Sequence, residues 1–160
     1  LDFYRLIHRM RTVSLRYSNV YGPRQDAHGD AGVVAIFSSA LLQGKEARIF
    51  GNGEQTRDYV FVEDVVDANL RVLSDSSIEG SYNIATAQET SVNQLYFMMA
   101  KLLNVEPRVT KVDAPAGEVQ RSCLDARRAK RAFSWEARHS LREGLEKTLD
   151  YFSSSLASCH

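Results

Sequence analysis

The stretch ARIFGNGEQTRDYVFVEDVV, residues 47–66, has apolar, β-prone segments on both sides of GNG, residues 51–53. Glycine tolerates the left-handed backbone that tight turns need, so this pattern predicts a β-hairpin with the glycines at its turn. The return strand begins with a charged pair, Arg57 and Asp58. After it, Asp64 is expected to cap the N-terminus of a helix. The sequence therefore predicts a hairpin that carries a cation where its second strand begins.

The guanidinium of Arg57 raises the question of which anion it meets. Arginine presents a planar fork of donors that suits phosphate oxygens, and it does not lose its charge. Beside a glycine turn that leaves the approach open, Arg57 could hold a phosphate. The alternative is a salt bridge to Asp58, Glu63 or Asp64. The stretch alone leaves both interpretations open.

Patterns typical of strands and of helices alternate around this stretch. Alternating apolar residues predict strands at 12–17 and 80–85. Apolar residues at helical spacing predict helices at 1–11, 33–44, 65–73, 92–103, 125–133 and 141–152. Two of these helices start with capping boxes, Ser91-x-x-Gln94 and Ser140-x-x-Glu143. Residues 19–32 and 107–119 are predicted to be loops, and the alternation as a whole predicts an α/β fold.

Composition limits the classes of partner. The 160 residues carry a formal net charge of zero, so no bulk attraction to nucleic acid or to a membrane surface is expected. The basic run DARRAKRAF, residues 125–133, is better explained as the solvated face of a helix than as a nucleic-acid patch. No apolar run approaches the ~18 residues of a membrane span.

The cysteines and histidines argue against disulfides and metal sites. Cys123 and Cys159 have no CxxC spacing, so we expect free thiols in a reducing compartment and predict a cytoplasmic location. No zinc-ligand spacing occurs among the histidines, which are His8, His28, His139 and His160.

A resemblance to one family runs through three segments: LRYSNVYGPRQ (15–25), IFGNGEQTRDYVFVEDV (49–65) and GEV...LD...SLREGLEKTLDYF (117–152). The segments are similar, in the same order, to the C-terminal part of NAD-dependent sugar-nucleotide epimerases and dehydratases, the extended short-chain dehydrogenase/reductases. The most similar group is the UDP-glucose 4-epimerases. The resemblance implies the substrate-binding part of an extended Rossmann-type epimerase.

The resemblance also implies a domain division. Residues 1–25 would be the last helix and strand of a dinucleotide-binding domain that is mostly absent. Residues 26–152 would be the nucleotide-sugar-binding portion, and residues 153–160 a disordered tail. A first helix and strand without upstream partners fit this division, because a lone strand is not stable by itself. We therefore expect the sequence to be cut from a longer chain.

A set of substrate-binding residues follows from the resemblance. Arg57 and Asn19 match residues that contact the diphosphate of a nucleotide sugar. Phe50 matches a residue that lies against the uracil ring, and Glu118 matches an acceptor for the ribose hydroxyls. Val34 belongs to the same set. Ordinary alternatives stay open for two of them: Phe50 could pack in the core, and Asn19 could be a turn residue that bonds its own backbone.

The cofactor implied by the resemblance is NAD, and Tyr17 matches a tyrosine on its nicotinamide side. The sequence contains no GxGxxG turn, which would present backbone amides to a pyrophosphate. It also contains no Tyr-x-x-x-Lys pair, in which the lysine lowers the pKa of the tyrosine for proton transfer. We therefore expect no catalytic residue in this chain.

Two departures from the family pattern bear on binding. Most relatives have an arginine two residues before the glycine of GEV, where it contacts a phosphate, and this chain has Pro115 there. Arg121 is too far along the chain to be assumed a substitute. Ala85 and Ala87 replace the glycines of a YNIGTG pattern, so any left-handed backbone there would be strained.

The sequence thus predicts the nucleotide-sugar-binding portion of an NAD-dependent UDP-sugar 4-epimerase, inactive by itself, whose parent interconverts UDP-glucose and UDP-galactose. The alternatives are a portion of a nucleotide-sugar 4,6-dehydratase and a non-catalytic nucleotide-sugar-binding module. The expected partner is a small UDP-sugar, not nucleic acid or a membrane. A homodimer or a strand-exchanged assembly could cover the exposed edge of the sheet.

Overall fold

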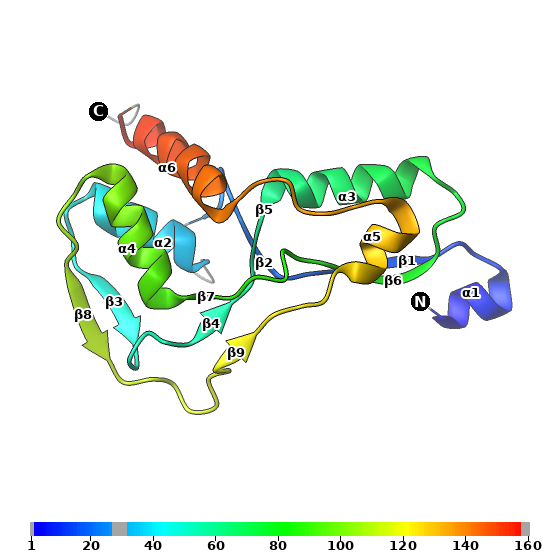
Figure 1. The fold of residues 1–160 in the computed structure, drawn as a ribbon, viewed down its shortest axis with the longest axis horizontal. Helices are drawn as coiled ribbons and strands as arrows, with labels where there is room; N and C mark the ends of the chain where they lie inside the picture. The colour runs from blue at the N-terminus through cyan, green and yellow to red at the C-terminus, as the bar shows by residue number, and fades with distance from the viewer. Residues whose placement is uncertain (1, 27–31, 158–160) are drawn as a thin grey trace.

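The computed structural model describes residues 2–26 and 32–157 (Figure 1). The helices in this part of the chain are α1 Asp2–His8, α2 Val33–Leu42, α3 Val62–Ser74, α4 Val92–Leu103, α5 Arg127–Phe133 and α6 Leu141–Ala157. The strands are β1 Val13–Tyr17, β2 Asn19–Tyr21, β3 Ala47–Phe50, β4 Thr56–Arg57, β5 Tyr59–Phe61, β6 Gly80–Ile84, β7 Thr90–Ser91, β8 Val109–Val112 and β9 Arg121–Ser122. Helices and strands alternate, which confirms the predicted α/β class.

One extended segment carries β1 and β2 and changes its partner half-way. β1 pairs in parallel with β6, and β2 pairs in parallel with β5. Between them, the N–H of Ser18 donates to the carbonyl of Ile84 at 3.0 Å, and the N–H of Asn19 donates to the carbonyl of Asp58 at 2.9 Å. The loop prediction is therefore wrong for residues 19–21, because β5 supplies a partner that the local pattern does not reveal. Asn19 stands where the strand changes partner, the kind of position at which α/β sheets bind ligands.

The predicted hairpin is wrong, although its turn is present. β3 pairs in parallel with β8, which lies in a predicted loop, and β4 pairs with β7 and β9. The two sides of the turn therefore do not pair with each other. φ is +61° at Gly51 and +78° at Gly53, a region that glycine adopts without the penalty of a Cβ. The turn redirects the chain from β3 toward β4, and the strand partners come from distant segments.

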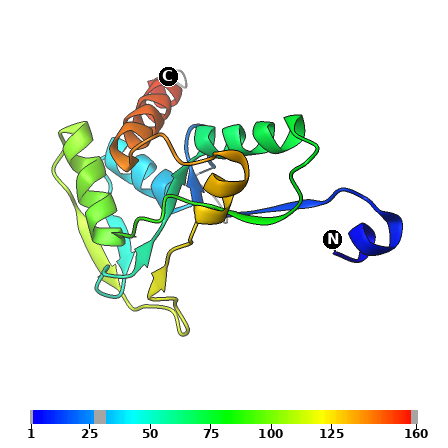
Figure 2. The ribbon, with the colours of Figure 1, turned by 45° about the vertical axis from the view of Figure 1, so that its right-hand side comes forward.

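β5 lies between two hydrophobic clusters and is buried along its whole length. Tyr59 and Phe61 belong to a cluster with α2, α4 and α6, whereas Val60 belongs to a cluster with α3, α5 and β6. Successive side chains of a strand point to opposite faces, so a strand between two cores needs an apolar residue at every position. Figures 1 and 2 show the result: α2, α4 and α6 gather on one side of β5, and α3 and α5 lie on the other.

The two predicted capping boxes are confirmed. The hydroxyl of Ser91 accepts from the N–H of Gln94 at 3.1 Å, and the side chain of Gln94 accepts from the N–H of Ser91 at 2.9 Å. Ser140 and Glu143 form the same reciprocal pair at 3.3 and 2.8 Å. Local sequence signals decide these helix starts, because both partners lie within one turn.

The predicted cap at Asp64 is wrong. α3 begins two residues earlier, at Val62, and its N-cap residue, Phe61, makes no side-chain cap bond. Asp64 is buried in the first turn, where its carboxylate accepts from the N–H of His139 at 3.2 Å and lies 2.9 Å from His139 Nδ1. A partner far along the chain has replaced the local role, and a local pattern cannot indicate such a partner.

The ends of the chain differ in how they pack. α6 continues to Ala157, so residues 153–157 are helical and not part of a disordered tail. α1 stands apart from the other helices in both views (Figures 1 and 2). Its side chains Phe3, Leu6 and Ile7 are exposed. The first helix therefore presents an apolar face that the described part of the chain does not cover.

Predictions on His28, Cys159 and His160 concern residues outside those that the structure describes. Cys123 is a free, exposed cysteine. Within residues 2–26 and 32–157, no helix combines the length and the hydropathy needed to cross a bilayer. In the same ranges, no group of three or more His, Cys, Asp or Glu side chains is placed to hold a metal ion.

Candidate functional site

One cavity collects four of the residues that the sequence singles out. It has a volume of about 500 Å³ and is lined by Asn19, Phe50, Arg57 and Glu118, together with the start of α2 and part of β3. The four residues come from β2, the end of β3, β4 and the turn before β9. Because the fold brings these separate segments together at one cavity, we take it as the candidate site and call it the Arg57 cavity.

The guanidinium of Arg57 is held by hydrogen bonds at one nitrogen and by a longer ion pair at another. Nη1 donates to the carbonyls of Thr56 and Val119 at 2.8 and 2.7 Å. Nη2 lies 3.7 Å from Glu118 Oε1, and the Arg57 side chain is 20% exposed. In the described part of the chain, neither Nε nor Nη2 makes a hydrogen bond. Arg57 is therefore held at the cavity wall with part of its donor fork available to an anion.

The three carboxylates considered as partners of Arg57 form no salt bridge with it in the described residues. Each has other partners: Asp58 has the N–H of Ala87, Glu63 has Lys147, and Asp64 has His139. The ion-pair partner of Arg57 is instead Glu118, which lines the same cavity. The pair therefore leaves Arg57 inside the candidate site.

Gln55 fixes the geometry of Glu118. This glutamine is buried, and its Nε2 donates to the carbonyl of Phe50 at 3.1 Å and to Glu118 Oε1 at 3.2 Å. One amide thus ties the end of β3 to the turn before β9. Buried polar groups with satisfied hydrogen bonds hold their surroundings rigid. Oε2 of Glu118 makes no hydrogen bond within the described chain, so it can accept one from a hydroxyl.

Phe50 and Asn19 both present open groups to the cavity. Phe50 is 44% exposed, which excludes the core-packing interpretation and leaves an aromatic surface for stacking. Asn19 is exposed, and its backbone N–H is bonded to Asp58. Its side-chain amide has no hydrogen-bond partner among the described residues, so the turn-asparagine interpretation does not apply there. The amide is free to donate and to accept.

Tyr59 forms a buried wall of the cavity beside Arg57. Its hydroxyl has no hydrogen-bond partner in the described part of the chain. Burial raises the pKa of Tyr59 to about 12, although the nearby charge of Arg57 lowers it. The phenol is neutral at physiological pH, so it places no negative charge beside the guanidinium.

Two predicted site residues lie away from the Arg57 cavity. Val34 is buried in the cluster with α2, and its neighbour Val33 lines the cavity instead. One residue is a rotation of about 100° around a helix, which is enough to turn a side chain from a cavity to the core. Tyr17 lines a separate cavity beside α3, and its hydroxyl donates to Asn69 Oδ1 at 3.1 Å.

Sequence reasoning missed Arg48, Gln55 and Tyr59, which also line the cavity. Arg48 could have been found from strand alternation, because it precedes Phe50 by two residues and so shares its face of β3. Gln55 could not, because its partner Glu118 lies 63 residues further on. Tyr59 carries no local signal either, since its place at the cavity depends on the pairing of β5 with β2.

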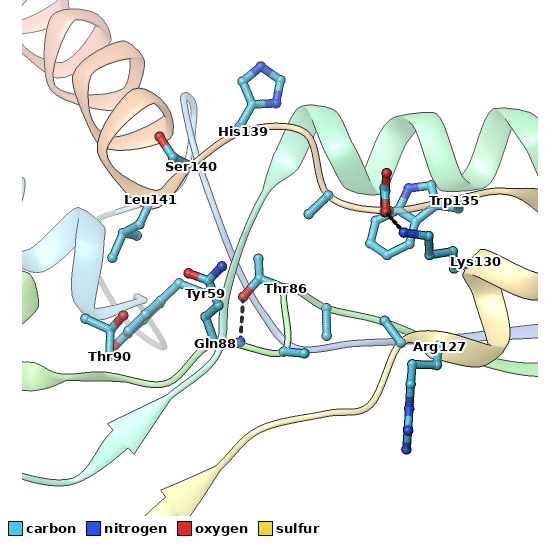
Figure 3. A pocket seen from close by; sticks show the side chains of 15 residues that line it. Tyr59, Thr86, Gln88, Thr90, Arg127, Lys130, Trp135, His139, Ser140 and Leu141 are labelled. Atoms are coloured by element: carbon cyan, nitrogen blue, oxygen red, sulfur yellow. Dashed lines mark hydrogen bonds and ion pairs between the residues drawn. The ribbon is translucent and has the colours of Figure 1, made fainter.

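A second cavity of about 300 Å³ lies between the loop after β6 and the loop before α6 (Figure 3). Its cations do not converge on a common point. Lys130 pairs with Glu136 at 2.5 Å, and Arg127 pairs with Asp125 at 2.6 Å and points away from the cavity in Figure 3. None of the site residues predicted from the sequence lines it. The Arg57 cavity is therefore the better candidate for an anionic ligand.

The N-terminal half of the chain matches a known protein family. The NAD dependent epimerase/dehydratase family matches residues 3–85, just over half of the 160 residues. The chain belongs to the NAD dependent epimerase/dehydratase family. The match covers the first two of the three sequence segments, and the relatives described next, which align over most of the chain, confirm the resemblance as a whole.

Several relatives of this epimerase/dehydratase chain are known. It is 41% identical over 152 residues to a UDP-glucose 4-epimerase of Mycolicibacterium smegmatis, covering 95% of this chain and 49% of that protein. The structure of a Thermotoga maritima UDP-glucose 4-epimerase with UDP-glucose superposes with a TM-score of 0.93 at 42% identity, covering 97% of this chain and 50% of that one. A Thermus thermophilus UDP-glucose 4-epimerase in complex with NAD superposes with a TM-score of 0.87 at 35% identity, covering 94% and 49%. The chain spans about half the length of the relatives it matches.

The family is NAD dependent, and one strand-to-helix junction among the described residues can be compared with the pyrophosphate site that NAD needs. Such a site presents helix N–H groups and a glycine-rich turn to the phosphates. The strand-to-helix junction from β5 to α3 has Phe61 at the N-cap and Glu63 and Asp64 in the first turn. Two carboxylates at a helix N-terminus would repel a pyrophosphate, so this junction does not fit the cofactor.

The loop after β6 shows one departure from the family pattern. Ala87 has a φ of +59°, so the strain expected where relatives have glycine is present. Ala85 is outside the positive-φ region, and the expectation of strain does not apply to it. The N–H of Ala87 donates to Asp58 Oδ2 at 2.9 Å. This bond to a buried carboxylate helps to hold the loop in its strained form.

The turn around Pro115 shows the other departure. The N–H of Glu118 donates to the carbonyl of Pro115 at 3.3 Å, so the proline is the first residue of the turn and the glutamate is the last. Arg121 does not replace the family arginine, because its Nε and Nη2 donate to Glu89 at 3.0 and 2.6 Å. Bonds from Arg121 and Thr56 lower the pKa of the Glu89 carboxyl to about 2. Any second cation for a ligand in the Arg57 cavity must therefore come from elsewhere.

Proposed function

We propose that this chain is the nucleotide-sugar-binding, C-terminal portion of a UDP-sugar 4-epimerase that interconverts UDP-glucose and UDP-galactose. The observation that carries the proposal is the convergence of Asn19, Phe50, Arg57 and Glu118 on one cavity of about 500 Å³. The relatives named above, which are UDP-glucose 4-epimerases, support it. NAD, when bound by the complete enzyme, supplies reversible hydride transfer at the sugar.

Arg57 and Asn19 hold the diphosphate in this proposal. Arg57 keeps Nη1 on two protein carbonyls and directs Nε and Nη2 toward phosphate oxygens. Asn19 adds an amide donor from the point where the strand changes partner. A charged fork and a neutral amide together suit an oxygen-rich anion, and the neutral phenol of Tyr59 adds no opposing charge.

Phe50 and Glu118 hold the nucleoside. The exposed ring of Phe50 stacks on the uracil, which contributes ~1–3 kcal/mol in comparable aromatic stacking sites. Glu118 accepts hydrogen bonds from the ribose hydroxyls through its free oxygen. All four residues grip the nucleotide and none is placed as a proton shuttle. Such an arrangement suits a 4-epimerase, in which the sugar must rotate within the site while the nucleotide stays fixed.

We also infer that the chain alone has no epimerase activity and does not hold NAD well, because the sequence contains neither a GxGxxG turn nor a Tyr-x-x-x-Lys pair. Turnover of UDP-galactose by the purified chain would contradict this inference. A portion of a 4,6-dehydratase and a non-catalytic binding module are the alternatives. The upstream coding sequence separates an enzyme portion from a module: an in-frame glycine-rich turn and Tyr-x-x-x-Lys pair indicate an enzyme, and a start codon near Leu1 indicates a module.

Calorimetric titration of the chain with UDP tests the proposal. We expect saturable binding, and we expect Arg57→Ala to weaken it by ~1.5–3 kcal/mol, the range for hydrogen bonds to a charged group. Arg142→Ala is the control, because it removes the same charge from an exposed ion pair on α6. A difference below about 0.5 kcal/mol between Arg57→Ala and the unmodified chain would remove Arg57 from the site.

We further propose a cytoplasmic location, supported by the free cysteine at position 123, and self-association as a homodimer or a strand-exchanged assembly. The exposed apolar side chains Phe3, Leu6 and Ile7 of α1 support self-association, because such a face is usually covered by protein. Light scattering of the purified chain at two concentrations tests it. A monomer at both concentrations would contradict the proposal.

A further inference from the structure

The Arg57 cavity contains a second arginine, Arg48, which lies in the middle of β3. Side chains alternate along this strand: Ala47 and Ile49 are buried, whereas Arg48 and Phe50 are exposed. Arg48 and Phe50 therefore share one face of β3. At a rise of about 3.3 Å per residue, their Cα atoms are separated by about 7 Å along the strand.

The guanidinium of Arg48 is not committed to a protein partner. Within residues 2–26 and 32–157 it makes no hydrogen bond or ion pair. Glu46, which lies just before β3, is bonded instead to the hydroxyl of Thr110 on β8. Thr110 lies directly opposite Arg48 in the parallel pair. A guanidinium that lines a cavity with its donors free is available to an acceptor on a ligand.

The order of residues along the cavity indicates which acceptor Arg48 meets. Gln55 donates to the carbonyl of Phe50, so the Phe50 end of β3 is the end nearest to β4 and Arg57. Arg48 lies on the other side of Phe50 from Arg57 along the strand. A nucleotide with its phosphates at Arg57 and its base on Phe50 presents the outer edge of the base, which carries the substituent at C4, to Arg48. At C4 uracil has a carbonyl oxygen, and cytosine has an amino group.

We propose that Arg48 determines base specificity by donating to the carbonyl oxygen on the outer edge of uracil. The inference rests on the proposed function, from which it takes the positions of the phosphates and the base. A guanidinium has donors and no acceptor, so it bonds to the uracil carbonyl but meets the cytosine amino group donor to donor. Thymine has the same carbonyl as uracil, so Arg48 rejects CDP and accepts both UDP and dTDP.

The test is a calorimetric titration of the full chain and two variants with UDP, CDP and dTDP. Arg48→Met keeps a long side chain and removes the donors. Lys111→Met is the matched control, because it removes one positive charge from the neighbouring strand β8 and does not line the cavity. We expect the unmodified chain and Lys111→Met to bind UDP roughly tenfold more tightly than CDP. We expect Arg48→Met to weaken UDP and dTDP and to bring the UDP-to-CDP ratio to within about twofold of one.

Each outcome separates this inference from the proposed function. A parallel fall in UDP and CDP affinity in Arg48→Met would show that Arg48 attracts phosphates and would overturn base specificity. A preference for UDP that Arg48→Met leaves unchanged would overturn it as well. If UDP binds and Arg57→Ala weakens binding, either result removes the inference and leaves the proposed function standing. If the unmodified chain does not bind UDP, both fall together.

Discussion

Asp58→Asn exchanges one oxygen for an NH₂ group inside a network that solvent does not reach. Asp58 is fully buried between Arg57 and Tyr59. Its Oδ1 accepts from the hydroxyl of Ser18 at 3.2 Å and from the N–H and hydroxyl of Thr86 at 2.9 and 2.7 Å. No Lys, Arg or His side chain pairs with this carboxylate in the described part of the chain. Hydrogen bonds are therefore the polar contacts that satisfy this buried carboxyl group.

Asparagine cannot satisfy the same set of donors. The backbone N–H of Thr86 donates to Oδ1 of Asp58, and the backbone N–H of Ala87 donates to Oδ2, both at 2.9 Å. Whichever way the new amide is turned, its NH₂ group faces one of these N–H groups. The change removes a hydrogen bond to a charged acceptor, worth ~1.5–3 kcal/mol, and leaves a buried donor unpaired. We expect the free energy of unfolding to fall by about 3 kcal/mol.

Urea unfolding at neutral pH, followed by circular dichroism, measures this loss. Asp67→Asn is the matched control, because its carboxylate pairs with Arg71 at 2.7 Å one turn along α3, in a partly exposed ion pair. We expect the control to lose less than about 0.5 kcal/mol. A loss below about 1 kcal/mol for Asp58→Asn, or equal losses in the two variants, would refute the argument that the hydrogen bonds to this buried carboxylate stabilise the fold.

Two further predictions follow from backbone strain and from burial. Ala87→Gly should raise the free energy of unfolding by about 1 kcal/mol, because φ is +59° there. Ala85→Gly, at a buried residue outside the positive-φ region, should lower it, and urea unfolding of both variants is the check. The pKa of Tyr59 is raised from 10.0 to about 12, so the folded chain keeps a proton that the unfolded chain loses. The contribution of Tyr59 to the free energy of unfolding is therefore fully present below pH 10 and is lost as the pH rises toward 12. Between pH 9 and pH 11 the unmodified chain should lose about 1.4 kcal/mol more than Tyr59→Phe, and equal losses would contradict the burial argument.

Local physical signals predict the elements of this fold better than their pairing. The capping boxes at Ser91 and Ser140 could be predicted because both partners lie within one turn of the chain. The hairpin could not be excluded, because the partners of β3 and β4 lie far along the sequence. Asp64 shows the same limit: a residue suited to a local cap is instead bonded to His139.

In the candidate site, too, residues recognised by their own motifs could be predicted, whereas contacts between distant segments could not. The residues placed at the cavity by a motif, Arg57, Asn19, Phe50 and Glu118, lie there in the structure. Gln55 connects two of them and could not be predicted, because its bonds depend on the folded arrangement of distant segments. Their role in binding stays a proposal, because geometry brings side chains together without showing what they bind.

The position of bound UDP on the chain tests the central claim most directly. A titration followed by ¹H–¹⁵N correlation spectra reports the position residue by residue. The account predicts saturable shifts in the backbone N–H signals of Asn19, Phe50, Arg57 and Glu118, with little change at Gln88 and Lys130 in the second cavity. Shifts confined to Gln88, Lys130 and their neighbours, or no shifts at millimolar UDP, would contradict it.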